Sequence, residues 1–145
     1  MSCVVYKKVS KVGISKRVIK ELVKFILDKT KTKNSGVDLS IHFIGDQKMR
    51  SLNYLYRGQD KTTDVLAFSL SDSKQIKTET DDLGDIFVSV PQVRRQAKEF
   101  EVSFKEELLR MVAHGVLHLL GYEHKNNQQA KKMFSTQEEL IKKFL

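Results

Sequence analysis

Residues 103–120 form the segment that most constrains how this chain can fold. Ser103 and Glu106 have the spacing of a capping box, which marks the start of a helix. The second half of the segment, residues 111–120, is apolar almost all round a helix. A helix of this kind has to be covered on all sides. We therefore expect it to be the buried centre of the domain.

Two histidines interrupt this apolar helix. His114 and His118 are four residues apart, so on an α-helix they project from the same face and can share a metal ion. Gly121 follows three residues later, where a glycine can adopt the left-handed conformation that ends a helix and reverses the chain. That reversal can bring His124 to the same ion, which predicts a three-histidine metal site.

The spacing HxxxHxxGxxH equals that of the metzincin zinc site. Three neutral imidazoles without a fourth protein ligand suit an open, catalytic zinc ion better than a closed structural one. Zn²⁺, one ion per chain, is the expected metal, with Ni²⁺ or another divalent ion as the alternative. Ordinary histidines are the competing interpretation, but unsatisfied imidazoles in an apolar interior would be costly. The remaining histidine, His42, is expected to be a surface residue.

Position 115 separates this chain from the metallopeptidases that share its spacing. Gly115 stands where HExxH peptidases carry the glutamate that acts as general base. Glu123, beside His124, could serve instead, but a carboxylate next to a ligand more often supports it or faces solvent. A metallopeptidase is therefore the least favoured of the hydrolase interpretations.

The hydrophobic periodicity of the remaining chain alternates between helix and strand. It predicts an α+β domain spanning residues 1–145, with a small mixed sheet of about four strands packed with five to six helices. Two of the strands are expected to pair as a hairpin around a long loop at residues 71–82. Predicted helices lie at about residues 15–30, 46–56, 91–100, 103–120 and 127–145, and predicted strands at 3–6, 37–44, 64–70 and 83–90.

Three expectations concern single side chains. Asp46 is expected to cap the short helix that follows the strand ending at Gly45. Phe100 is expected to share an apolar helix face with Val93 and Ala97. Phe134 is expected to lie on the apolar face of the last helix, together with Met133, Ile141 and Phe144.

Charge and cysteine content narrow the class of protein. The 26 Lys and Arg residues against 18 Asp and Glu give a net charge of +8, which favours polyanionic partners such as RNA, DNA or anionic membranes but does not choose among them. No apolar run reaches the length of a membrane span, and the N-terminus lacks the pattern of a secretory signal. With Cys3 as the single cysteine, we expect a soluble, cytoplasmic protein.

The metal motif and two further segments resemble the YbeY family of bacterial endoribonucleases and rRNA maturation factors. The similarity spans most of residues 37–145. The chain departs from the family pattern at Ala67, where the family usually has Ser, and at Glu123, where it usually has Asp. The segments that carry the resemblance are His114-Gly-x-Leu-His-Leu-x-Gly-Tyr-acid-His124, Asn53-x-x-x-Arg57 followed by Thr63-Asp-Val-Leu-Ala-Phe68, and Leu83-Gly-Asp-Ile86.

This resemblance implies a function and the residues that perform it. The function is that of a zinc-dependent, single-strand-specific endoribonuclease in maturation of the small-subunit rRNA 3′ end and in ribosome quality control. The implied partners are rRNA, the ribosome and small-subunit proteins, without a membrane or DNA. The implied metal ligands are His114, His118 and His124, and the implied catalytic residue is Arg57, in a cleft lined with basic residues. A cation beside a metal can bind phosphate and stabilise the extra charge of its transition state.

The sequence is compatible with more than one function and more than one mechanism. A non-catalytic ribosome assembly factor with a structural zinc ion would carry the same motif. For an endoribonuclease, either water or the RNA 2′-hydroxyl could attack the phosphorus. Asn53, Asp64 and Asp85 are uncertain as site residues, because polar residues at strand ends commonly hold loops together.

Overall fold

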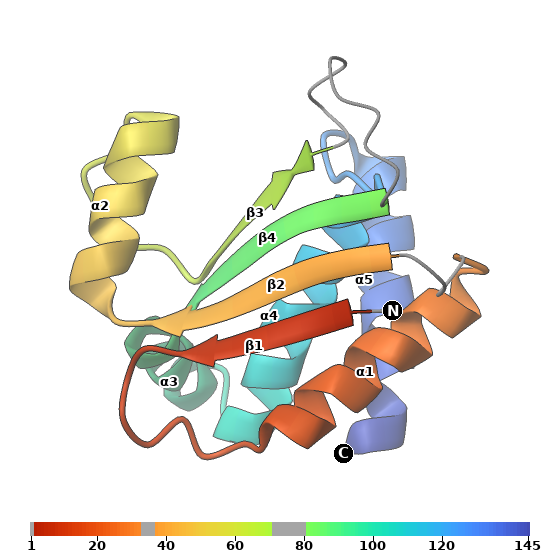
Figure 1. Cartoon of the computed structure of the whole chain (residues 1–145), viewed down its shortest axis with the longest axis horizontal. Helices are drawn as coiled ribbons and strands as arrows, with labels where there is room; N and C mark the ends of the chain where they lie inside the picture. Colours follow the sequence, from red (N-terminus) through yellow and green to blue (C-terminus); the bar gives the residue numbers. More distant parts are fainter. Residues whose placement is uncertain (1, 33–36, 71–80) are drawn as a thin grey trace.

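The computed structural model describes residues 2–32, 37–70 and 81–145 (Figure 1). Within these ranges the elements follow the order expected from the sequence, including the early strand. They are β1 (Ser2–Lys7), α1 (Lys16–Lys29), β2 (Val37–Ile44), α2 (Asp46–Arg57), β3 (Val65–Ser69), β4 (Asp81–Ser89), α3 (Val90–Glu99), α4 (Phe104–Leu119), α5 (Asn127–Ile141) and a closing 3-10 turn, Lys142–Phe144.

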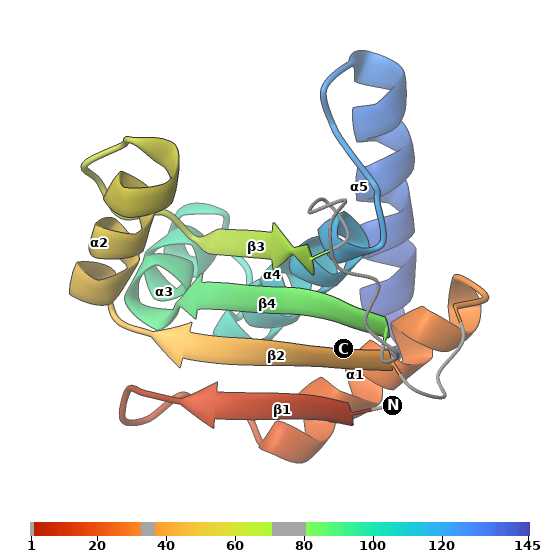
Figure 2. The ribbon, with the colours of Figure 1, turned by 45° about the horizontal axis from the view of Figure 1, so that its top comes forward.

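The strands form one mixed sheet in the order β1-β2-β4-β3. β1, β2 and β4 run parallel, whereas β3 runs antiparallel to β4, as Figure 2 shows by the direction of its arrow. The α+β class and the β3–β4 pairing are therefore confirmed. Most of the expected loop between these two strands, residues 71–80, lies outside the described residues. β3 forms one edge of the sheet.

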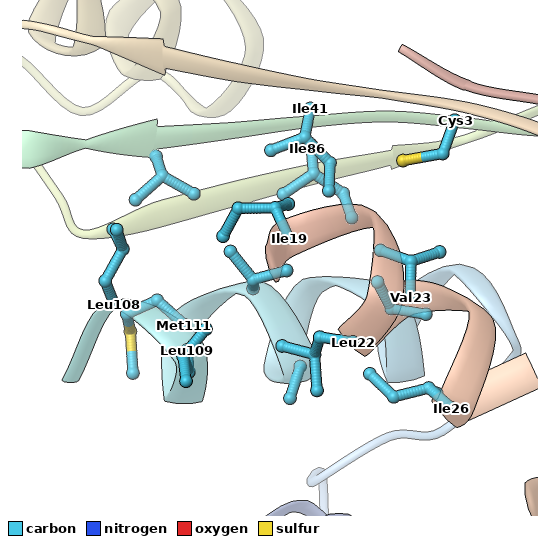
Figure 3. Packing of buried hydrophobic residues seen from close by; sticks show 14 of the residues in the cluster. Cys3, Ile19, Leu22, Val23, Ile26, Ile41, Ile86, Leu108, Leu109 and Met111 are labelled. Atoms are coloured by element: carbon cyan, nitrogen blue, oxygen red, sulfur yellow. The ribbon is translucent and has the colours of Figure 1, made fainter. Parts of the chain in front are cut away.

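The helix α4 occupies the centre of the molecule, as its apolar sequence predicts. Ten of its sixteen residues are buried, and its side chains meet those of α1 beneath the strands (Figure 3). Each fully buried Leu, Ile or Val contributes roughly 1.5–3 kcal/mol of hydrophobic stabilisation. The helix that carries two of the histidines is thus held by the main core.

Side-chain caps define where the helices begin. The Ser103 hydroxyl accepts a hydrogen bond from the Glu106 amide at 3.0 Å, as expected. The Glu106 carboxylate, in contrast, binds Arg110 at 2.9 Å, so the described contacts include only half of the predicted capping box. Pro91 lies in the first turn of α3, where its missing amide hydrogen costs little.

The expectation for Asp46 is wrong. Gly45 is the N-cap of α2, and Asp46 is the first helical residue. Its carboxylate instead accepts two hydrogen bonds from Arg95, at 2.8 and 2.9 Å, and one each from Ser89 and Thr62. These bonds lower the pKa of Asp46, the Arg95 guanidinium being the largest cause. The residue ties α2 to the end of β4 and to α3.

His42 is not the ordinary surface residue that the sequence suggested. Its ring stacks between Tyr6 and Phe87, with centroid separations of 4.8 and 4.4 Å, and only 20% of its side chain is exposed. The three residues lie opposite one another on β1, β2 and β4. Neighbouring strands therefore cover a position that strand periodicity alone assigns to solvent.

Gly84 marks a close approach between β4 and β3. Its φ is +129°, and a Cβ atom built there would lie 1.9 Å from the backbone oxygen of Phe68. Only glycine satisfies both the backbone angle and this contact.

Among the residues that the structure describes, no helix is long and apolar enough to cross a bilayer.

Candidate metal centre

The three histidines converge as the spacing predicts. His114 and His118 come from the last two turns of α4, and His124 comes from the turn that follows. One ring nitrogen from each residue lies within 4.8 Å of the other two. Small ring rotations can bring such a set to the roughly 2 Å metal–nitrogen distances of imidazole sites. The triad can therefore bind a metal ion.

The turn at Gly121, which ends α4, returns the chain so that His124 lies near the other two histidines. Gly121 has φ +97°, and its amide donates to the His118 carbonyl at 3.0 Å. The Tyr122 amide donates to the Leu117 carbonyl, also at 3.0 Å. These two bonds make the Schellman arrangement that ends many helices. The chain reversal expected at Gly121 is confirmed.

His114 is oriented by a residue of α5 that the sequence did not indicate. Its Nδ1 lies 2.9 Å from Oε1 of Gln137, a side chain that is only 4% exposed. An amide oxygen can only accept, so Nδ1 carries the hydrogen and Nε2 remains the nitrogen that can bind a metal. Gln137 thereby favours the tautomer that leaves Nε2 of His114 free to bind a metal.

Replacing Gln137 with leucine is expected to weaken zinc binding by about 10- to 100-fold, because partners of metal-bound histidines typically contribute that much. Competition with a chromophoric chelator measures the affinity. Gln137→Glu keeps the acceptor and should stay close to the wild type, and Gln128→Leu, at an exposed position of the same helix, is the matched control. Equal affinities for Gln137→Leu and wild type would rule out this orienting role.

Both helix-borne histidines are poised to be neutral at pH 7. Burial lowers the pKa of His114 below its usual value. Burial, together with the nearby His114 and His124, lowers the pKa of His118 to about 4. Metals bind only unprotonated imidazole, so a lowered pKa reduces the competition from protons near neutral pH.

The lowered pKa of His118 predicts how the stability of the metal-free protein changes in acid. The unfolded chain protonates His118 near pH 6.5, whereas the folded chain holds it neutral to about pH 4. Between these values the unfolded state binds more protons, so the free energy of unfolding should fall as pH drops from about 6.5 towards 4. Urea titrations in a chelator at several pH values test this. His118→Gln should flatten the decline, and an unchanged slope in that variant would contradict the assignment.

The triad opens into a cleft of about 1060 Å³. Residues 63–68, which include most of the edge strand β3, line it together with parts of α4 and α5 and the end of α3. Arg57, in the last turn of α2, lines the same cleft. The structure thus brings the predicted arginine and the three histidines to one site.

The cleft is not simply basic, which corrects the implied lining. Its basic residues Arg57, Arg110 and Lys125 are matched by the acids Asp64, Glu107 and Glu123. Arg110 is held by three carboxylates, which raise its pKa, and the Lys125 ammonium lies 3.3 Å from Glu123. Among the described residues, no carboxylate lies within 4.0 Å of the Arg57 guanidinium. Its charge is therefore available to a ligand.

Comparison with known proteins places this arrangement in a family. The family model described as Endoribonuclease YbeY matches residues 5–145. The chain belongs to the YbeY family. Two proteins named Endoribonuclease YbeY illustrate the similarity: one from Persephonella marina is 39% identical over 89% of this chain and 83% of its own, and one from Malacoplasma penetrans is 40% identical over 94% and 87%.

The YbeY assignment agrees with a solved fold. A Thermotoga maritima protein, determined in solution, superposes with a TM-score of 0.64 at 28% identity, covering 96% of this chain and 86% of its own. The family identified from the motifs around Arg57, Gly84 and the histidines is therefore confirmed over nearly the whole chain.

The structure also explains why this YbeY chain lacks the peptidase glutamate. A Cβ atom at Gly115 would lie 2.8 Å from Cγ2 of Ile86, a fully buried residue of β4. Position 115 thus faces the sheet rather than open space, and a glutamate there would place a carboxylate against apolar side chains. Glu123 lines the cleft but pairs with Lys125.

Two phenylalanines lie where the sequence did not place them. Phe100 is 59% exposed and Phe134 is 45% exposed, and both line the cleft instead of completing an apolar helix face. Periodicity counts an aromatic residue as core and cannot recognise a site-lining ring. In the last helix, Met133 and Ile141 are fully buried as expected.

The three uncertain polar residues prove to have different positions. Asp64 lines the cleft, where its carboxylate accepts the Val65 amide at 2.7 Å. Asn53 is buried, and its amide donates to the Lys61 carbonyl at 2.8 Å, which holds the loop after α2. Asp85 lies beside His42 and is not among the residues that line the cleft.

Proposed function

We propose that this chain is a zinc-dependent, single-strand-specific endoribonuclease that matures the 3′ end of small-subunit rRNA and acts in ribosome quality control. Its proposed setting is the cytoplasm, with the ribosome or small-subunit proteins as partners. One observation carries the proposal: three converging histidines line the same cleft as an arginine that pairs with no carboxylate of the described residues. A cation and a metal site at one cleft suit a phosphodiester substrate.

The chain's own residues have distinct proposed roles. His114, His118 and His124 hold the zinc ion, with Gln137 fixing the His114 tautomer. When bound, zinc supplies a Lewis acid that neutralises phosphate charge and acidifies a water molecule. Arg57 binds the phosphate through its guanidinium and stabilises the negative charge that grows as phosphorus gains a fifth oxygen.

Basic residues outside the cleft give the RNA a longer-range attraction. The solvent-facing side of α1 carries the exposed residues Lys16, Lys20 and Lys24, together with Arg17, which pairs with Glu21. Such a positively charged side raises the local RNA concentration and makes binding weaker at high salt. The cleft can then be nearly neutral in charge and still serve an anionic substrate.

RNA cleavage by purified protein tests the proposed function. The zinc-loaded chain should cut single-stranded RNA, leave an equally long hairpin stem intact, and lose activity with a chelator. Product ends identify the attacking group: water leaves a linear phosphate monoester, and the 2′-hydroxyl leaves a 2′,3′-cyclic phosphate.

The His114→Ala variant separates the enzyme from an assembly factor. For an enzyme, the variant should remain folded and lose both zinc and cleavage. If the variant instead unfolds and the wild type never cuts RNA, zinc is structural and the assembly-factor alternative stands. Chelator-sensitive cleavage of unstructured protein, without cleavage of RNA, would favour a peptidase.

A further inference from the structure

Phe134 places an exposed aromatic ring beside the metal ligands. Its centroid lies 6.1 Å from that of His114 and 5.9 Å from that of His124, with interplanar angles of 15° and 23°. It lines the cleft from α5 and is 45% exposed. The ring is thus nearly parallel to two of the imidazoles, and much of its surface is open to the cleft.

This exposure is not a consequence of helix packing. The preceding residue, Met133, is fully buried and anchors this turn of α5 in the core. Phe134 projects from a different side of the helix and forgoes part of the hydrophobic stabilisation that full burial of such a side chain provides. A ligand that covers the ring would recover this stabilisation.

Charge and shape together point to the ligand. Arg57 offers a cation at the same cleft, with no carboxylate partner in the part of the chain that the structure describes, and this suits a phosphate. Phe134 offers a flat apolar face, which suits a nucleobase. An unpaired nucleotide presents both groups on one short unit. In a duplex, both faces of a base are already covered by its neighbours, so this ring favours a single strand.

We propose that Phe134 is the stacking platform for one unpaired base next to the phosphate held by Arg57 and the metal. This inference rests on the proposed ribonuclease function and deepens it, because it assigns the single-strand preference to a particular side chain. Phe134 is a specificity residue in this scheme, and it takes no part in bond making or breaking.

Variants at position 134 distinguish aromatic stacking from the effect of an apolar side chain alone. Phe134→Leu keeps an apolar side chain of similar size without an aromatic face, whereas Phe134→Tyr keeps the face. Leu55→Ala, at a 71% exposed position of α2 that is not among the cleft-lining residues, is the control for removal of exposed apolar surface. Zinc content is measured for each protein, so that damage to the metal site is recognised.

The probe is a single-stranded oligoadenylate RNA of roughly 12 nucleotides, together with a series in which an abasic ribose replaces each nucleotide in turn. Fluorescence anisotropy with the zinc-loaded proteins gives the affinities. It is read before cleavage has progressed, and a gel of the same samples verifies that the RNA is still full-length at that time. Wild type should lose about 5- to 100-fold in affinity at one abasic position. Phe134→Leu should bind intact RNA correspondingly more weakly and be indifferent to that abasic position, while Phe134→Tyr and Leu55→Ala should behave like wild type.

Each contrary outcome has a distinct meaning. If Phe134→Leu binds intact RNA as well as wild type does, stacking is refuted while the ribonuclease function stands. If the variant binds weakly but remains as sensitive to the abasic position as wild type, the ring does not contact that base, and the inference also fails. If wild type neither binds nor cuts the RNA, the proposed function itself fails and the stacking site with it.

Discussion

Replacing Arg57 with alanine is expected to slow RNA cleavage by about 100- to 1,000-fold, the usual loss when one donor to a transition-state charge is removed. The guanidinium lines the cleft, and no carboxylate of the described residues neutralises its charge. The fold should be unaffected, because the side chain is exposed at the end of α2.

Single-turnover cleavage rates with saturating RNA measure this effect, alongside zinc content and melting temperature. Arg50→Ala is the matched control, since Arg50 is an exposed arginine of the same helix that pairs with Asp60 and is not among the cleft-lining residues. Arg57→Lys should recover only part of the rate, because an ammonium cannot make the two parallel hydrogen bonds of a guanidinium. A rate for Arg57→Ala within threefold of wild type would remove Arg57 from the proposed catalytic site.

Gly84→Ala is expected to cost roughly 3–5 kcal/mol of folding free energy, the combined size of backbone strain and a steric clash in a packed region. The added Cβ would lie 1.9 Å from the Phe68 backbone oxygen, and backbone cannot move aside as a flexible side chain can. Relief requires separating β3 from β4. Since β3 lines the cleft, the variant should also bind RNA more weakly.

Urea denaturation compares this variant with Gly58→Ala. Gly58 also has a positive φ, +68°, but a Cβ atom there meets nothing within 4 Å. That control should lose only about 1–2 kcal/mol, the cost of the left-handed conformation alone. If the two variants are equally stable, the close contact between the strands does not constrain position 84.

The convergence of the three histidines was predictable from the sequence because its geometry is local. A helical repeat places His114 above His118, and the glycine-ended turn returns His124 within a few residues. The element order was predictable for a similar reason, since each helix or strand shows its own period. Arg57, distant along the chain, came from a family motif.

Other features depend on which elements meet in space, and no local pattern contains that information. The contact of Gln137 with His114 requires the angle at which α5 crosses α4. The partial burial of His42 depends on β1 and β4 lying on either side of β2. The balanced charge of the cleft likewise arises from pairs such as Arg110 with Glu138, which are far apart in sequence.

The position of α4 has a consequence for how this protein can tolerate mutation. Ten of its sixteen residues are enclosed by neighbours, and two more are the metal-site histidines. Arg110 is engaged by three carboxylates, and Phe104 lies under the Arg94 guanidinium. Almost every substitution in this helix would therefore disturb either the hydrophobic core or the site formed by the histidines. The outward side of α1 is exposed and touches neither the core nor the histidines, and its proposed attraction for RNA depends on overall positive charge. Substitutions that keep this charge can therefore accumulate there without changing the site.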